Sequence, residues 1–94
     1  MTGVERIAAE RQRQIEKEGW TPEHDAEHIE GELRDAAIAY AQVCDPRAGE
    51  CAQDVFPWDD SWWKPSDDPI PNLVKAGALI AAEIDRLAAT EEDR

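Results

Sequence analysis

Alanine dominates the apolar part of this 94-residue chain and limits the folds that the chain can adopt. Of the 39 hydrophobic residues, 15 are alanine, 15 are valine, isoleucine or leucine, and six are aromatic. Alanine is the strongest helix former, and its small side chain lets helices pack closely. No segment alternates polar and apolar residues for long enough to predict a strand. We therefore expect one all-α domain over residues 1–94.

The large aliphatic side chains are too few to build a sizeable core in a chain of this length. The shortage predicts a homo-oligomer, a dimer or higher, that buries further apolar surface between subunits. We expect the contact to form through the alanine and glycine face of the last predicted helix, where backbones can approach closely.

The net charge of −12, from 22 acidic and 10 basic residues, restricts the partners of the chain. Binding to general nucleic acid or to an anionic membrane requires clustered lysine and arginine, so both are excluded. No apolar run approaches the ~20 residues that span a bilayer. The first residues also lack the hydrophobic stretch of a signal peptide.

Two cysteines, Cys44 and Cys51, are too few for a disulfide framework or for a four-cysteine zinc site. We therefore expect a reduced, cytoplasmic protein. A disulfide between these two residues remains an alternative, because it would close only a short loop.

Helix signals divide the chain into three predicted helices joined by a tryptophan-rich loop. The expected helices span roughly residues 3–18, 22–43 and 68–89, with Asn72 as an alternative start of the last one. Gly19 is placed to cap the first helix in the left-handed conformation, and Thr21 with Pro22 is a strong start signal for the second. The residues from Thr90 to Arg94 are expected to form a frayed polar tail.

The second and last helices are expected to run antiparallel and to pack through apolar stripes. The stripe of the second helix contains Ile29, Leu33, Ala36, Ala37 and Tyr40. The stripe of the last helix contains Leu73, Gly77, Ile80, Ile84 and Leu87. Between these helices, residues 49–71 hold three of the four tryptophans and are expected to pack as a loop with one short helical turn from Trp58 to Trp63.

Histidines and carboxylates concentrate at the start of the second predicted helix. On a continuous helix, His24, Asp25, His28 and Glu32 share one flank, because each residue turns by about 100°. Imidazole and carboxylate groups at this spacing could hold a divalent metal ion, namely Mg²⁺, Mn²⁺ or Zn²⁺. Asp25, His28 and Glu32 are also the candidate catalytic residues, as a general base beside a substrate. The alternative is a solvated acidic surface, which is favourable near a helix N-terminus.

Aromatic and basic residues form a second candidate set. The predicted ligand-binding residues are Trp20, Tyr40, Trp58, Trp62, Trp63, Lys64, Lys75 and Arg86. Aromatic rings can stack on a base while one or two cations hold a phosphate, as in the binding of a free nucleotide. We expect the aromatic residues, Lys64 and Lys75 to line one pocket beside the flank from Asp25 to Glu32. The alternative is that the tryptophans only fill space between the helices.

Several motifs, in this order, resemble a family of small proteins from phages and prophages. They are Glu10-Arg11-x-x-Gln14, Glu18-Gly19-Trp20, His24-Asp25-x-x-His28, Gly31-Glu32-Leu33, Trp62-x-Lys64-Pro65 and Leu73-Val74-Lys75-Ala76-Gly77-Ala78-Leu79. The match spans nearly the whole chain. The resemblance implies a phage context, a location in the host cytoplasm, and a function in nucleotide metabolism or in countering host defence.

A weaker similarity links the chain to the MazG-like all-α nucleotide pyrophosphohydrolases. Those enzymes hold Mg²⁺ with a carboxylate pair on each of two helices. Here the first helix offers Asp25, His28 and Glu32, but the second pair is absent from the segment around Lys75, and Glu83 and Asp85 come later. Two carboxylate pairs are needed to hold Mg²⁺ on a triphosphate. The absence of the second pair therefore counts against hydrolysis and leaves nucleotide binding open.

Three functions follow as hypotheses. The first is a non-catalytic protein that binds or sequesters a nucleotide or a nucleotide-derived signal. The second is a metal-dependent hydrolase of nucleoside triphosphates. The third is an acidic interaction module that mimics nucleic acid, which rests on the net charge alone.

Overall fold

The computed structural model describes the backbone of residues 1–43, 45 and 49–92, and the side chains of these residues except 49–51 and 91–92. Over these residues the chain forms only helices, turns and loops, which confirms the all-α prediction. The elements are α1 (Gly3–Lys17), α2 (Pro22–Asp25), α3 (Glu32–Gln42), α4 (Gly49–Val55), the short 3₁₀ helix η1 (Asp60–Trp62) and α5 (Pro69–Glu92).

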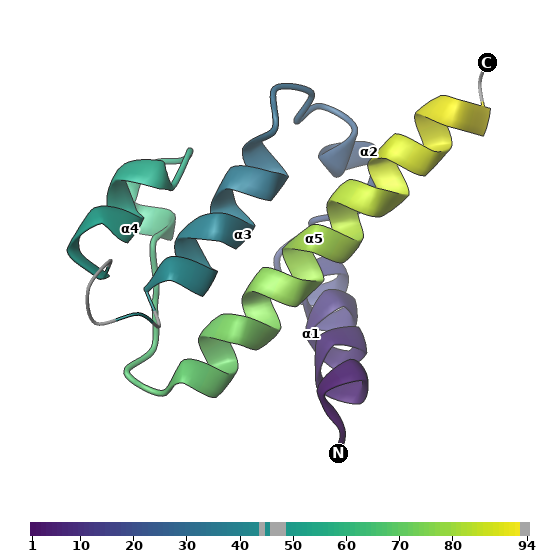
Figure 1. The fold of residues 1–94 in the computed structure, drawn as a ribbon. Coiled ribbons are helices and arrows are strands. Elements are labelled where there is room, and N and C mark those ends of the chain that lie inside the picture. Colours follow the sequence, from purple (N-terminus) through teal and green to yellow (C-terminus); the bar gives the residue numbers. More distant parts are fainter. Residues whose placement is uncertain (44, 46–48, 93–94) are drawn as a thin grey trace.

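Helix α5 is the longest element and packs against α1, α2 and α3. Figure 1 shows α3 beside α5 and antiparallel to it, with α1 behind α5 and α4 on the far side of α3. The antiparallel pair expected from the sequence is therefore present, although its first member is the 11-residue α3. No helix among the described residues is both long and apolar enough to cross a membrane.

The start and end of α1 follow from local sequence signals. The Thr2 hydroxyl accepts a hydrogen bond from the Glu5 N–H, and the Glu5 carboxylate accepts one from the Thr2 N–H, which is a reciprocal capping box. Gly19 follows the helix with a φ of +74°, the left-handed conformation predicted for it. The chain therefore reverses at Gly19 and brings Trp20 back toward the body of the protein.

The prediction of one helix over residues 22–43 is wrong. The helix begins after Thr21 as expected, but α2 ends at Asp25 and α3 starts only at Glu32. Gly31 has a φ of +85°, which a right-handed helix cannot contain, so the chain turns here between two helices. Ile29, expected in the core, lies in this connection and is 71% exposed.

The segment between α3 and α5 is more helical than expected. Helix α4 was not predicted, whereas η1 falls inside the expected turn from Trp58 to Trp63. The possible disulfide between Cys44 and Cys51 lies outside the described side chains. Helix α5 starts at Pro69, the earlier of the two expected positions, and continues to Glu92, where the polar tail was expected.

The core lies between α3 and α5 and is built mainly from alanine. It contains Leu33, Ala36, Ala37, Ala39, Tyr40, Phe56, Ala76, Leu79 and Ala82, with Trp20, Val55, Trp58 and Trp63 packed against it. The expected face of the second helix is confirmed from Leu33 to Tyr40.

The prediction that the apolar stripe of α5 is buried in the core is wrong. Its large members, Leu73, Ile80, Ile84 and Leu87, are each about half exposed, and the buried positions are instead Asn72, Ala76, Ala78, Leu79 and Ala82. The break replaces one long helix beside α5 with the four-residue α2 and the 11-residue α3, and the side of α5 that is buried is the one with the small alanines. The alanine face, expected to mediate oligomer contact, is therefore used inside the chain.

Candidate ligand-binding site

Three tryptophans form the walls of an open cleft, which we call the tryptophan cleft. Trp20 comes from the loop between α1 and α2, and Trp58 and Trp62 come from the segment after α4. The cleft has a volume of about 340 Å³, at the lower end of the range for small-molecule sites. Its lining residues are Glu18, Trp20, His24, His28, Trp58, Asp59 and Trp62.

Aromatic contacts hold the walls of the cleft in place. The ring centroids of Trp20 and Trp58 are 5.9 Å apart, and those of His28 and Trp58 are 5.2 Å apart. His24 meets His28 edge to face at 4.9 Å. Trp62 is 49% exposed, so its ring is available to stack on a flat ligand.

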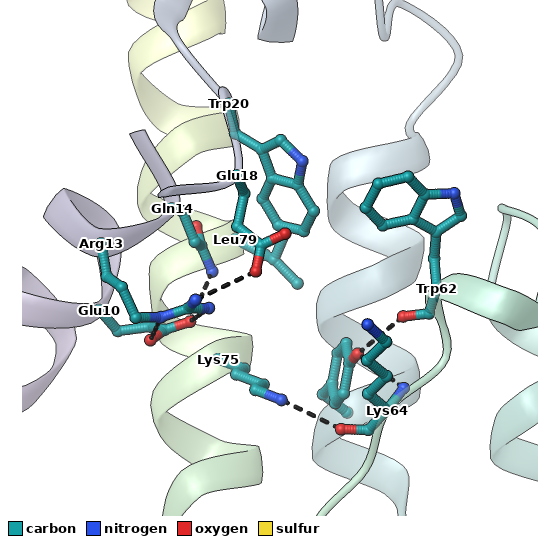
Figure 2. Close-up of a pocket in the computed structure, with 10 residues that line it drawn as sticks. Glu10, Arg13, Gln14, Glu18, Trp20, Trp62, Lys64, Lys75 and Leu79 are labelled. Carbon is teal, nitrogen blue, oxygen red and sulfur yellow. Dashed lines mark hydrogen bonds and ion pairs between the residues drawn. The ribbon is translucent and has the colours of Figure 1, made fainter. Parts of the chain in front are cut away.

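A second, smaller hollow of about 40 Å³ adjoins the cleft, and we call it the cationic pocket. It is lined by Glu10, Arg13, Gln14, Glu18, Trp20, Tyr40, Trp62, Lys64, Lys75 and Leu79. Glu18, Trp20 and Trp62 line both hollows, which therefore meet at the two tryptophans. In Figure 2 the rings of Trp20 and Trp62 face one another, with Lys64 and Lys75 on one side of them.

The positive charge of Arg13 in the cationic pocket is balanced by two neighbouring carboxylates. Arg13 donates to Glu10 through Nε at 2.7 Å and to Glu18 through Nη1 at 3.0 Å. These hydrogen bonds raise the pKa of Arg13. Burial acts to raise the pKa of Glu10, but Arg13, Gln14 and the charge of Lys75 together lower it. Arg13 thus supplies a fixed, paired charge.

Unlike Arg13, the two lysines of the cationic pocket keep N–H donors that could bind an anion. Lys75 Nζ donates to the Lys64 carbonyl oxygen at 3.0 Å and lies 5.4 Å from the centre of the Tyr40 ring. This contact uses one of its three N–H donors. The ammonium group of Lys64 has no ion pair within the described part of the chain, and its side chain is exposed.

Tyr40 forms the floor beside these lysines. It is 6% exposed, and its hydroxyl oxygen accepts a hydrogen bond from the Lys64 N–H at 3.3 Å. Burial and the charges of Glu10 and Glu18 raise the pKa of Tyr40, against the effect of the Lys64 N–H. The hydrogen bond joins the tryptophan-rich segment to α3 and so positions Lys64.

Two buried polar atoms of the site lack a hydrogen-bond partner among the described residues. They are Oε1 of Gln14, on a side chain that is 2% exposed, and Nε2 of His28. Gln14 lines the cationic pocket and His28 lines the tryptophan cleft. A buried polar atom without a partner is unfavourable. Both atoms have almost no accessible surface, so a bound molecule could satisfy them only after a shift of the neighbouring side chains.

His28 is oriented by Glu32. The distance from His28 Nδ1 to Glu32 Oε2 is 3.2 Å, so Nδ1 carries the hydrogen and Nε2 of the neutral ring is an acceptor. Glu32 does not line the cleft.

The proposed metal ligands are not gathered into one set. Asp25 is 2% exposed and forms a 2.6 Å ion pair with Arg11, while Glu32 binds His28. Among the described residues, no group of three or more histidine, cysteine, aspartate or glutamate side chains is arranged to hold a metal ion. The predicted flank required a continuous helix. In the broken helix its members still meet in pairs, His24 with His28 and His28 with Glu32, but Asp25 is paired with Arg11.

Two of the predicted ligand-binding residues lie elsewhere. Trp63 packs against Tyr40 and Phe56, with ring centroids 4.9 Å apart in both cases, and belongs to the core. Arg86 forms a 2.6 Å ion pair with Glu83 and lines a separate hollow between α2 and α5. The structure brings together Trp20, Tyr40, Trp62, Lys64 and Lys75 as expected, and Trp58 with His28 and His24.

Sequence reasoning missed the contribution of α1 to this site. Glu10, Arg13 and Gln14 lie three and four residues apart, so they share one helix face. That spacing was a usable signal for a charged face, but it does not reveal which element the face meets. Asp59 was also missed, although it lies next to Trp58.

No family model, no curated protein and no solved structure matches the chain.

Proposed function

We propose that the protein binds a small nucleotide, with the base in the tryptophan cleft and the phosphate at Lys64 and Lys75. The observation that carries this proposal is that Trp20 and Trp62 line both hollows. The base and the phosphate of one nucleotide are a few ångströms apart. The base would thus stack on the tryptophans while the phosphate contacts the two lysines. Binding without turnover is consistent with sequestration of a nucleotide or nucleotide-derived signal.

The cleft suits a heteroaromatic base better than an aliphatic ligand. Stacking on tryptophan accepts any base and contributes about 1–3 kcal/mol per base. Nε2 of His28 and the carboxylates of Glu18 and Asp59 are acceptors at its edge. They would pair with the amino or imino N–H groups that bases carry.

The cationic pocket suits one phosphate group. Only 10 of 94 residues are basic in this acidic chain, yet three of them line this hollow. Since Arg13 is paired with Glu10 and Glu18, the available positive charge comes from Lys64 and Lys75. The unpartnered Oε1 of Gln14 would accept from a ribose hydroxyl or an ordered water nearby.

The alternative of a metal-dependent hydrolase receives no support from the site. Asp25, which would have to hold the metal, is committed to Arg11. The acidic interaction module rests on net charge and predicts no dependence on the tryptophans.

Calorimetric titration with a nucleotide and its two halves tests the proposal. The probes are AMP, GMP, CMP and UMP, then the nucleoside of the tightest binder, and inorganic phosphate. Lys64→Ala is expected to weaken nucleotide binding by about 5- to 30-fold while leaving nucleoside binding unchanged. Trp62→Ala is expected to weaken both by a similar factor.

Lys17→Ala is the matched control, because Lys17 is an exposed lysine at the end of α1 that lines none of these hollows. It should bind as the unaltered protein does. The proposal fails if none of the four nucleotides binds at millimolar concentration, or if Lys64→Ala and Lys17→Ala behave alike. Equal loss of nucleoside and nucleotide binding in Lys64→Ala would place the phosphate elsewhere.

A further inference from the structure

The outer face of α5 carries an apolar stripe whose large side chains the described part of the chain leaves about half exposed. Ile70, Leu73, Ile80, Ile84 and Leu87 are between 49% and 59% exposed. Figure 1 shows α5 lying in front of the other helices, with no element over its outer side. The monomer thus leaves five large aliphatic side chains in water on one helix.

The spacing of the stripe is that of a helix-pairing seam. Ile70, Leu73, Gly77, Ile80, Ile84 and Leu87 follow one another at intervals of three, four, three, four and three residues. A repeat of 3.5 residues keeps apolar side chains on the line along which two helices meet. Scattered surface leucines, which are ordinary, would not show this regularity.

Gly77 does not interrupt the stripe. A Cβ atom at this position would lie 2.6 Å from Cδ1 of Ile7, so the side chain of Ile7 fills the space that the glycine leaves. Helix α1 therefore borders the stripe at its middle and adds its own apolar surface there. The stripe spans 18 residues from Ile70 to Leu87, or about 26 Å of helix.

We propose that a second copy of this chain covers the stripe, with α5 packing on α5 about a two-fold axis. The area is sufficient: half-exposed aliphatic side chains expose on the order of 100 Å² each, so five from each copy bury about 1,000 Å², the lower bound for a specific interface. A two-fold pair lets the same patch serve both copies.

Charge also favours this face for self-association. Two chains of net charge −12 repel one another over most of their surface. Over residues 69–90, however, α5 carries only two acidic residues, Glu83 and Asp85, against Lys75 and Arg86, so this part of the helix adds no net charge to the repulsion. The pairing also leaves the ligand site open, because Lys75 and Leu79 lie on the opposite side of α5 from the stripe.

The experiment is sedimentation velocity between 1 and 100 µM, with circular dichroism to follow folding. The unaltered protein should sediment with twice the chain mass of 10.5 kDa. Ile80→Asp places a charge at the centre of the stripe and should sediment as a single chain with unchanged helicity. Ile29→Asp, the same substitution at an isoleucine that is 71% exposed off the stripe, should remain a dimer.

A milder variant covers the case in which Ile80→Asp unfolds. Ile84→Ala should raise the dimer dissociation constant about tenfold. Three results would each overturn the proposal. The unaltered protein could sediment as a single chain at 100 µM, which would leave the stripe to a different protein, or it could sediment with a mass above two chains. The third result is an unchanged dissociation constant in both Ile84→Ala and the folded Ile80→Asp protein.

Discussion

The Arg11 guanidinium and the Asp25 carboxylate, 14 residues apart in sequence, meet at 2.6 Å with side chains that are 11% and 2% exposed. Arg11 also donates to the Trp20 carbonyl oxygen at 3.1 Å. One side chain of α1 thus holds both α2 and the loop that carries a wall of the tryptophan cleft. A residue that the sequence places on a candidate metal-binding flank is, in the fold, a structural anchor.

Replacing Asp25 should therefore destabilise the protein strongly. Asp25→Asn keeps the shape of the side chain but leaves the Arg11 charge buried without its counter-ion. Removing one partner of such a pair costs about 3–5 kcal/mol. Urea unfolding measures the loss, and Asp35→Asn is the control. Because Asp35 pairs with Arg34 at the surface, its replacement should cost less than about 1 kcal/mol, and equal losses would contradict the anchoring of α2.

Gly31 should be required by its backbone conformation. At a φ of +85°, Gly31→Ala forces an alanine into the left-handed region, at a cost of about 1–2 kcal/mol. Its Cβ would also lie 2.5 Å from Nη2 of Arg34, but that exposed side chain can move away. Gly3→Ala is the matched control, since nothing lies within 4 Å of the added atom there. Thermal unfolding should show a lower midpoint for Gly31→Ala alone.

Acid should remove a contribution of Glu32 to stability. Partial burial acts to raise the pKa of Glu32, but hydrogen bonds from its own N–H, from His28 and from the Glu30 N–H together lower it below the usual value of 4.5. The unfolded chain then takes up this proton before the native chain does. The contribution is therefore complete above pH 4.5 and is lost as the pH falls through the lowered native value.

Glu32→Gln should consequently flatten the fall in unfolding temperature between pH 5 and pH 3, without abolishing the contributions of other carboxylates. Glu27→Gln, at an exposed neighbour whose side chain has no hydrogen bond within the described residues, should follow the unaltered protein. Identical pH profiles for all three proteins would mean that the contact with His28 does not stabilise the fold.

Local signals in the sequence predicted the ends of helices better than their continuity. Thr21 with Pro22 and Gly19 are cap residues, and a cap acts within one turn, so these predictions held. The break at Gly31 was missed because a glycine inside a helical pattern costs only about 1 kcal/mol and does not by itself end a helix. The pairing of Asp25 with Arg11, which holds α2 to α1, is a contact between distant residues that no local signal reveals.

Helix periodicity found the apolar stripe of large side chains on α5 but did not identify which side of the helix is buried. The stripe with the larger side chains was predicted to be buried, whereas the fold buries the side with Ala76 and Leu79. The choice depends on the length of α3, which the periodicity overestimated. The candidate site was predicted in its aromatic part and in Lys64 and Lys75, while Arg13 and Gln14 depended on the packing of α1, which no local pattern encodes. The resemblance to phage proteins stays a prediction.

Helix α2 is only four residues long, and this brevity bears on the dynamics of the molecule. It spans a single turn, in which the Asp25 and Ala26 amides bond to the carbonyl oxygens of Thr21 and Pro22. Opening this turn would break the Arg11–Asp25 pair but would not require the rest of the protein to unfold, so these amides should exchange with solvent deuterium before those in the middle of α5. The same opening would displace His24 and Trp20 from the cleft, and a bound nucleotide would slow it. The ligand would then enter through the same local opening of α2 that exposes these amides. A bound nucleotide should therefore slow hydrogen exchange at the Asp25 and Ala26 amides.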